Sequence, residues 1–302
     1  MKKIIIVLAS LAMAVSSFAA TELPSDRTIT KDYDLKGFSG IVASGIYDVQ
    51  LTKSESWGVS LSFPEVLEDY IVVRVSNGKL YLSMKQVPMK ISKNYKNWTV
   101  KACVGMPVFE SLDLSGAAKF QCDDTFDIGD REFKLDVSGA SKVNGLSIVA
   151  KELEMEMSGA SFARVNGDFI NVEIEMGGAA KCEFEISADY MNQEISGAAK
   201  AYHTGEFDRI EVEASGAALF SFTGLANKMD FEVSGAAKLE SSKARVNDVK
   251  ASVSGASYCE VNAQDNLRVD CSGASSLRYV DHDNLKLDIR SINRGSSITK
   301  MK

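Results

Sequence analysis

Residues 115–118 read Ser-Gly-Ala-Ala, and the chain returns to this phrase eight more times as Ser or Gly, then Gly, then Ala, then Ala or Ser. Successive copies are 18–23 residues apart, and most intervals are 19 or 20 residues. A nearly fixed period of this length is typical of a solenoid, in which each repeat stacks on the next. The central glycines of the nine copies are Gly116, Gly139, Gly159, Gly178, Gly197, Gly216, Gly235, Gly255 and Gly273.

The residues before each copy alternate between apolar and polar, as in Leu153-Glu154-Met155-Glu156-Met157. Strict alternation is the period of a β-strand with one buried face. The Gly that follows accepts a positive φ without steric conflict, so we expect the chain to turn there. The small Ala and Ser residues after it fit a tight corner.

A repeat of about 19 residues is too short for a strand and a full crossover helix, but it can hold two or three short strands at about 3.3 Å per residue. The sequence therefore predicts an all-β fold, a right-handed parallel β-helix whose coils stack about 4.8 Å apart. A leucine-rich-repeat horseshoe has a similar period, but its sequence pattern is absent. A propeller blade needs about twice this length.

The first 20 residues have the pattern of a secretory signal peptide. Lys2 and Lys3 precede an apolar run over residues 4–15, and small residues follow at Ser17 and Ala19. The run is short for a membrane span, so we expect an exported protein without a transmembrane segment after signal cleavage, in the periplasm, on the cell surface or outside the cell.

Three further regions follow the signal peptide. Residues 21–37 form a polar lead, residues 38–110 form irregular starting coils that also cap the solenoid, and residues 111–302 form the regular repeats. Asn77-Gly78 lies between two alternating apolar runs, which predicts a hairpin in the starting region. Gly295 is expected to be a tenth, degenerate copy of the turn.

The most unusual feature of the repeats is a column of acidic residues at the third position before the central glycine. If the coils stack in register, neighbouring carboxylates lie about 5 Å apart, where like charges repel or recruit cations. One interpretation is a binding face, with Ca²⁺ as a conceivable ion; the alternative is a solvated face that keeps the rod soluble. The acidic column consists of Asp113, Asp136, Glu156, Glu175, Glu194, Glu213, Glu232 and Asp270, with Ser252 at the remaining position.

A partial basic column three residues after the glycine favours the solvated face, because its lysines could offset the acids. These are Lys119, Lys142, Lys181, Lys200 and Lys238. The formal net charge of −7 makes nucleic acid an unexpected partner.

Residue types that carry catalysis or bind metals form no pattern in the sequence. The five cysteines lack a Cys-x-x-Cys spacing, and most are expected to be buried small hydrophobes. His203 and His282 are the only histidines, so we expect no metal site, no resident cofactor and no catalytic residue. Aromatic residues follow the turns, and we expect them to fill the core: Phe120, Phe162, Phe184, Tyr202, Phe220 and Tyr258.

Three sequence features together resemble the head-GIN-domain family of auto-transporter adhesins. They are Ser44-Gly45-Ile46-Tyr47-Asp48-Val49, Asn77-Gly78-Lys79-Leu80 and the repeated Ser-Gly-Ala-Ala/Ser steps. The family motif reads Gly-Ile-Asn, and this chain has Tyr47 in place of Asn. The resemblance covers roughly residues 35–300 and implies a right-handed β-helix of a secreted or envelope protein, with no catalytic residues to transfer.

The favoured function is therefore a secreted or envelope-associated binding or structural protein, adhesin-like, with a surface glycan or a matrix or envelope protein as its partner. The alternative is a polysaccharide-processing enzyme, because a β-helix is also a scaffold for such enzymes. That alternative requires polar groups gathered in a cleft beside long loops, whereas the short repeats spread the acids evenly. We therefore expect a protein that is not an enzyme.

Overall fold

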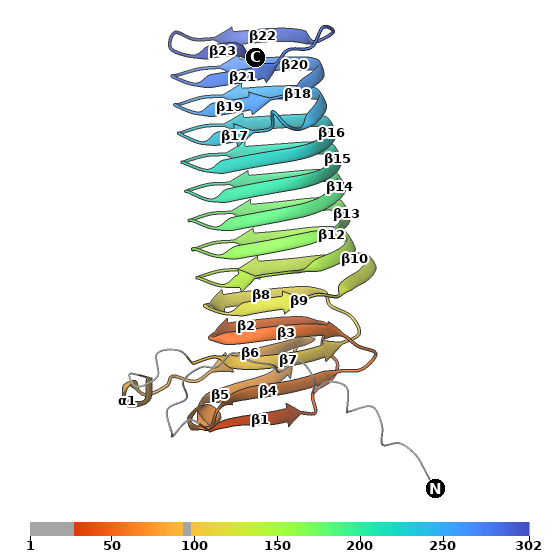
Figure 1. Ribbon diagram of the computed structural model, residues 1–302, viewed down its shortest axis with the longest axis vertical. Coiled ribbons are helices and arrows are strands. Elements are labelled where there is room, and N and C mark those ends of the chain that lie inside the picture. The colour runs from red at the N-terminus through yellow and green to blue at the C-terminus, as the bar shows by residue number, and fades with distance from the viewer. Residues whose placement is uncertain (1–26, 93–97, 302) are drawn as a thin grey trace.

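The computed structural model describes residues 27–92 and 98–301 of the chain. They form one rod of stacked coils, with the N-terminal coils at one end and the C-terminal coil at the other (Figure 1). The β-solenoid has about ten turns of about 19 residues, so the predicted fold class is confirmed. The expected signal peptide, residues 1–20, lies outside the described residues.

The N-terminal coils contain seven strands and two short helices. These are β1 (Thr28–Tyr33), β2 (Gly40–Gly45), β3 (Tyr47–Lys53), β4 (Gly58–Pro64), the 3₁₀ helix η1 (Glu65–Tyr70), β5 (Ile71–Ser76), β6 (Lys79–Met84), α1 (Met89–Ser92) and β7 (Val100–Met106).

The regular stack follows from residue 111. Its strands are β8 (Ser111–Gly116), β9 (Lys119–Cys122), β10 (Thr125–Val137), β11 (Lys142–Val143), β12 (Ser147–Met157), β13 (Phe162–Met176), β14 (Lys181–Ile195), β15 (Lys200–Ala214), β16 (Leu219–Val233), β17 (Lys238–Glu240), β18 (Arg245–Val253), β19 (Tyr258–Val261), β20 (Ala263–Cys271), β21 (Ser276–Val280), β22 (Lys286–Ile292) and β23 (Ser297–Met301).

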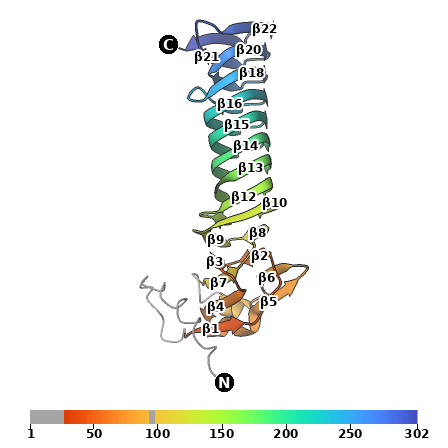
Figure 2. The same ribbon diagram turned by 90° about the vertical axis from the view of Figure 1, so that its right-hand side faces the viewer.

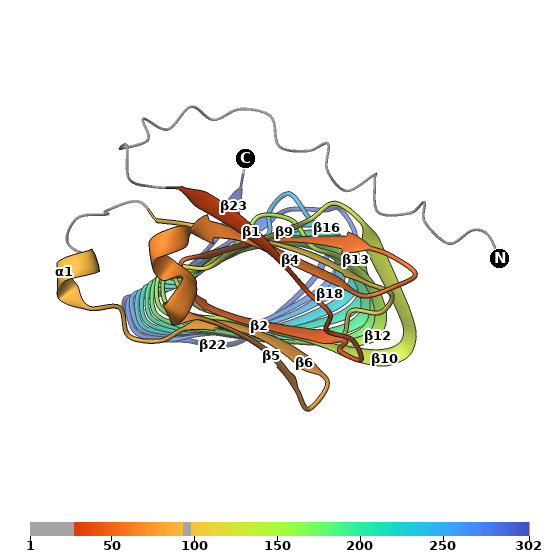
Figure 3. The same cartoon turned by 90° about the horizontal axis from the view of Figure 1, so that it is seen from below.

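Each central coil is a flattened loop of chain with two broad faces. The strands that lead into the Ser-Gly-Ala-Ala turns pair in parallel to form one sheet, here called the leading sheet. The strands that leave the turns pair in parallel to form the opposite face, the trailing sheet. Strands β13 to β16 run through both sheets and bend midway, so one edge of the rod consists of turns and the other of bends (Figures 2 and 3).

The starting coils do not follow chain order along the rod. Strand β2 pairs in parallel with β6 on one side and β8 on the other, while β3 pairs with β7 and β9. The β2–β3 coil therefore lies between a later coil, β6–β7, and the first coil of the regular stack (Figure 1). Only non-local pairing produces this order, and no local sequence signal could have predicted it.

Antiparallel strands close the N-terminal end of the rod. Strand β1 pairs with β4, β4 pairs with β7, and β5 pairs with β6 in the predicted hairpin at Asn77-Gly78. Strand β1 lies within residues 21–37, which the sequence analysis assigned to a polar lead. That assignment overlooked the strand because only Ile29 and Tyr33 of its six residues are half-buried, while its backbone hydrogen bonds to β4 provide the pairing.

The core is one continuous cluster of inward side chains from Phe38 to Tyr279. Phe109 stacks on Phe120 with ring centroids 5.6 Å apart and contacts Phe126 and Phe133 edge-on, which fills the start of the regular stack. Within the described residues, helices are too short and too polar to cross a membrane.

Candidate functional site

The repeated turns form a ladder along one edge of the rod. All nine central glycines have φ between 68° and 75°, which confirms the predicted positive φ. The N–H of the residue after each glycine donates a hydrogen bond to the carbonyl oxygen of the glycine in the preceding coil, as Ala179 does to Gly159 at 2.7 Å. Toward the N-terminus the ladder extends to Gly45, whose carbonyl oxygen accepts a hydrogen bond from the N–H of Ala117. At the other end Gly295 also has a positive φ, 101°, and lies beside Gly273, but the N–H of Ser296 donates to Asn293 instead of to Gly273. The expected tenth copy is thereby confirmed.

Glycine is required in this ladder for a second reason, which the sequence analysis missed. A Cβ added to Gly178 would lie 2.8 Å from the carbonyl oxygen of Gly159 and 3.0 Å from its nitrogen. The turns thus approach each other too closely for any side chain. The small residue two positions after each glycine is buried, as expected for a tight corner, for example Ala180 and Ala199.

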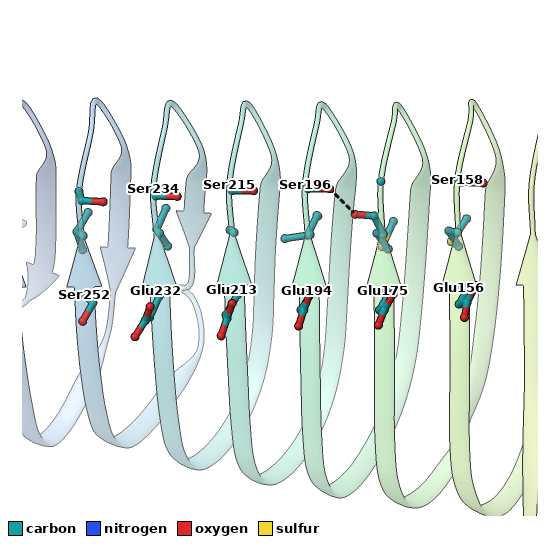
Figure 4. A pocket seen from close by; sticks show the side chains of 18 of the residues that line it. Glu156, Ser158, Glu175, Glu194, Ser196, Glu213, Ser215, Glu232, Ser234 and Ser252 are labelled. Carbon is teal, nitrogen blue, oxygen red and sulfur yellow. Dashed lines mark hydrogen bonds between the residues drawn. The ribbon is translucent and has the colours of Figure 1, made fainter.

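The acidic column forms as the sequence analysis expected, on the outer surface of the leading sheet beside the turns. Its members lie opposite one another in the strand register, as in the pairs Glu156–Glu175, Glu175–Glu194 and Glu194–Glu213. Figure 4 shows these carboxylates in a row along successive strands, with a second row of turn serines next to them. Adjacent parallel strands are about 4.8 Å apart, so seven steps from Asp136 to Asp270 span roughly 34 Å.

Two carboxylates near the starting coils have pKa values above the ordinary range of aspartate. Burial raises the pKa of Asp113, against an opposing effect of Lys79. Burial also raises the pKa of Asp136, and the neighbouring Asp113 carboxylate adds to the increase. Stacked acids therefore repel one another where solvent is partly excluded.

A comparison with the next column on the same sheet shows how the acidic column differs. Closer to the bend, basic residues occur among the acidic ones and form ion pairs between coils, such as Lys134 with Glu154 and Arg209 with Asp230. Within residues 27–92 and 98–301, no member of the acidic column takes part in an ion pair. In the described part of the chain, ion pairs therefore do not offset the negative charge of the column.

The lysine column lies on the trailing sheet, on the far side of the turns from the acids. Successive lysines are in register there, and Lys181 pairs with Glu183 of its own strand at 2.8 Å. The sequence analysis expected these lysines to offset the acidic column. In the described part of the chain they form no ion pair with it, because the two columns face outward from opposite sheets.

A groove of about 700 Å³ runs along the acidic column. It contains every column acid except Asp113, the serines of successive turns, and small or aliphatic side chains such as Met176 and Ile195. No basic or aromatic side chain of the described residues lines this groove. Among those residues, no group of three or more His, Cys, Asp and Glu side chains is arranged to hold a metal ion.

A buried polar pair interrupts the apolar core behind the groove. His203 Nε2 lies 2.7 Å from Gln193 Oε1, and the imidazole stacks between the rings of Phe184 and Phe220. Complete burial lowers the pKa of His203 to about 3, so the ring is neutral. The sequence carried one signal of this pair: Gln193 occupies a position that is otherwise apolar in the repeats.

Other side chains partly follow the sequence analysis. Four of the five cysteines are buried and all five are free, with Cys103 exposed. Three of the six expected core aromatics are buried, but Phe162, Tyr202 and Tyr258 lie half-buried on the outer surface of the trailing sheet, so that expectation was wrong for them. They lie at outward positions of the strands, where Lys181 is 5.7 Å from the ring centroid of Phe162.

The fold and the groove define a β-solenoid with a long, repeated acidic face. The chain belongs to the family described as "Putative auto-transporter adhesin, head GIN domain", whose model matches residues 37–183 and 168–282. No curated protein matches the chain.

Two solved structures similar to this chain come from species of Parabacteroides. A "putative adhesin" from Parabacteroides distasonis is 16% identical with a TM-score of 0.51, covering 91% of this chain and 98% of its own. A "putative adhesin" from Parabacteroides merdae is 15% identical with a TM-score of 0.49, covering 91% and 97%. At this identity the first likeness shows a shared fold and nothing more.

Proposed function

We propose that this chain is an adhesin-like binding protein of the cell surface or envelope, and that the groove along the acidic column is its binding site. The observation that supports this proposal most strongly is the groove itself, in which seven column acids form no ion pair with any described residue. Membership of an adhesin family and the signal-like residues 1–20 support export and a binding role. Four-residue turns in place of long loops, and evenly spaced acids, argue against the polysaccharide-processing alternative.

The chemistry of the groove favours one class of ligand. Carboxylates and hydroxyls attract cationic groups and N–H donors, whereas the absence of basic side chains from the lining disfavours an acidic glycan. The absence of aromatic rings from the lining removes the usual stacking surface for sugars. The ligand is therefore an extended, basic segment of a surface or matrix protein, about ten residues long if it follows the whole groove at about 3.4 Å per residue.

Fluorescence anisotropy with labelled peptides tests this proposal. A ten-residue peptide that alternates Lys and Ser is expected to bind, and the Glu/Ser counterpart is not. The variant with Glu175, Glu194 and Glu213 replaced by Gln should bind roughly tenfold more weakly, since each exposed charge contributes about 0.5 kcal/mol. Affinity should also fall as salt rises.

A second triple variant controls for net charge. Glu185, Glu206 and Glu240 are exposed, lie away from the groove and form no ion pair among the described residues. Replacing them with Gln changes the formal charge equally and should leave binding within about twofold. Equal losses in both variants would show attraction by overall charge alone and would overturn the groove as the site. Millimolar Ca²⁺, which the sequence analysis considered for this face, should compete with the peptide if it binds the same carboxylates.

A further inference from the structure

The outer surface of the trailing sheet is basic and aromatic next to the turns, although the rod as a whole is acidic. Between residues 142 and 240, the outward positions three and five residues after the central glycines hold five basic and two acidic residues, whereas the whole chain holds 34 basic and 41 acidic residues. We call six of these residues the trailing strip: Lys142, Phe162, Lys181, Lys200, Tyr202 and Lys238.

Three of the four lysines of the trailing strip have no acidic partner among the described residues. Lys142, Lys200 and Lys238 are exposed, and none of them forms an ion pair there. Lys181 and Lys200 are register partners, and like charges opposite one another on adjacent strands oppose pairing. The strip therefore carries positive charge that is available to an anionic ligand.

Two half-buried aromatic rings lie among these lysines. Lys181 Nζ lies 5.7 Å from the ring centroid of Phe162 and 5.4 Å from that of Tyr202, so one ammonium group lies beside both rings. Arg164 lies 5.9 Å from the ring centroid of Phe162. Glu183 pairs with Arg164 at 2.6 Å and with Lys181 at 2.8 Å. The one acid at the centre of the strip is thus matched by two cations, and the centre keeps an excess of positive charge.

Rings and cations side by side on a flat sheet match the chemistry of acidic sugars. The apolar C–H face of a sugar ring stacks on an aromatic side chain, and a carboxylate or sulfate group of the same sugar attracts an ammonium group. A neutral glycan would use only the rings. Nucleic acid carries one charge per about 3.4 Å of each strand, which is closer than the spacing of about 4.8 Å between coils, and the net charge of −7 repels such a dense polyanion.

We propose that the trailing strip binds a linear acidic polysaccharide, which runs along the rod, stacks on Phe162 and Tyr202 and pairs its anionic groups with the lysines. Five coil steps from Lys142 to Lys238 span roughly 24 Å, so several consecutive sugars contact the strip. The strip and the acidic column face outward from opposite sheets (Figure 3). The polysaccharide site is therefore distinct from the groove and does not depend on what the groove binds.

Isothermal titration calorimetry of the full chain tests the proposal, with EDTA present to remove Ca²⁺. Oligogalacturonate long enough to span the strip, or a sulfated galactan of the same length, is expected to bind, and the two arms distinguish carboxylate from sulfate as the anionic group. The methyl ester of oligogalacturonate keeps the sugar rings without the charge and should bind about tenfold more weakly. Oligothymidylate of equal charge should also bind more weakly than the better acidic sugar. Binding of neither acidic sugar, or tighter binding of oligothymidylate, overturns the proposal.

Two variants separate the charges from the rings. Lys142→Gln, Lys200→Gln and Lys238→Gln, made together, remove three exposed charges and should weaken polysaccharide binding about tenfold. Tyr202→Thr removes one ring, keeps the net charge and retains a residue type that favours strands, and it should weaken binding roughly twofold to tenfold. If the lysine variant binds more weakly but Tyr202→Thr does not, attraction of any polyanion explains the binding, and the polysaccharide assignment is refuted.

A matched triple variant controls for net charge. Lys151, Lys250 and Lys286 are exposed, lie outside the trailing strip on β12, β18 and β22, and form no ion pair with a described residue. Lys151→Gln, Lys250→Gln and Lys286→Gln, made together, should leave binding within about twofold of the wild type. An equal loss in both triple variants rules out the strip as the site. The triple glutamine variant of the groove should still bind the polysaccharide, so a failure of one proposal is distinguishable from a failure of the other.

Discussion

Replacing Gly178 with Ala tests the turn ladder at its centre. Gly178 has φ 68°, a conformation that costs a residue with a Cβ about 1–2 kcal/mol. The new Cβ would also lie 2.8 Å from the carbonyl oxygen of Gly159, so the coils must move apart, at a further cost of about 1–3 kcal/mol. The expected loss of stability is therefore roughly 2–5 kcal/mol, and Gly178→Val should lose more because its branched side chain resists positive φ.

Thermal unfolding followed by circular dichroism measures this effect. For a chain of this size, each kcal/mol of lost stability lowers the melting temperature by about 2–4 °C, so Gly178→Ala should melt roughly 4–20 °C below the wild type. The neighbouring Gly177 provides the control, because its φ is ordinary and the nearest atom to an added Cβ is Ser196 Oγ at 3.6 Å. Most other copies have Ser at this position, so Gly177→Ser should melt within about 2 °C of the wild type. If Gly178→Ala had the same melting temperature as Gly177→Ser, the close contact between the turns would be refuted.

Three further predictions concern buried and stacked polar groups. The pKa of His203 is about 3 when folded and about 6.5 when unfolded, so the unfolded state binds more protons between these values and stability falls as pH falls. Relative to His203→Phe, the wild type should lose about 3 kcal/mol between pH 7 and pH 4 in urea titrations. Gln193→Leu leaves His203 without its hydrogen-bond partner and should lower the free energy of unfolding by about 1–3 kcal/mol at pH 7. Adding His203→Phe to this variant should recover most of that loss. If the losses of the two single variants simply added in the double variant, the coupling between the two side chains would be disproved. The pKa of Asp136 is raised by folding, so its charged form opposes folding. Asp136→Asn should therefore raise the melting temperature slightly at pH 7 but not at pH 3. A melting temperature below that of the wild type at pH 7 would contradict the repulsion.

The acidic column shows how far local patterning reaches. Alternation over five residues placed Glu156 outward and Met157 inward, and a constant period placed Glu175 and Glu194 directly opposite in the next coils. The existence of a column therefore followed from the sequence. The groove beside it did not, because its shape depends on the path of the backbone into each turn. The bend edge was also missed: a Cβ on Gly205 would lie 1.7 Å from the carbonyl oxygen of Ile186, but these glycines recur in only a few coils.

The sequence by itself determined the repeating unit, the alternation of inward and outward residues before each turn, and the turn position, because these depend on interactions within one coil and on a period that repeats. Only the tertiary structure decided that β2–β3 lies between β6–β7 and β8–β9, that His203 meets Gln193, and that antiparallel strands lie at the N-terminal end of the rod. Those features depend on contacts between segments far apart in the chain. Such contacts give no repeating pattern in the sequence, since each forms only once and is selected by packing and by the pairing of free strand edges.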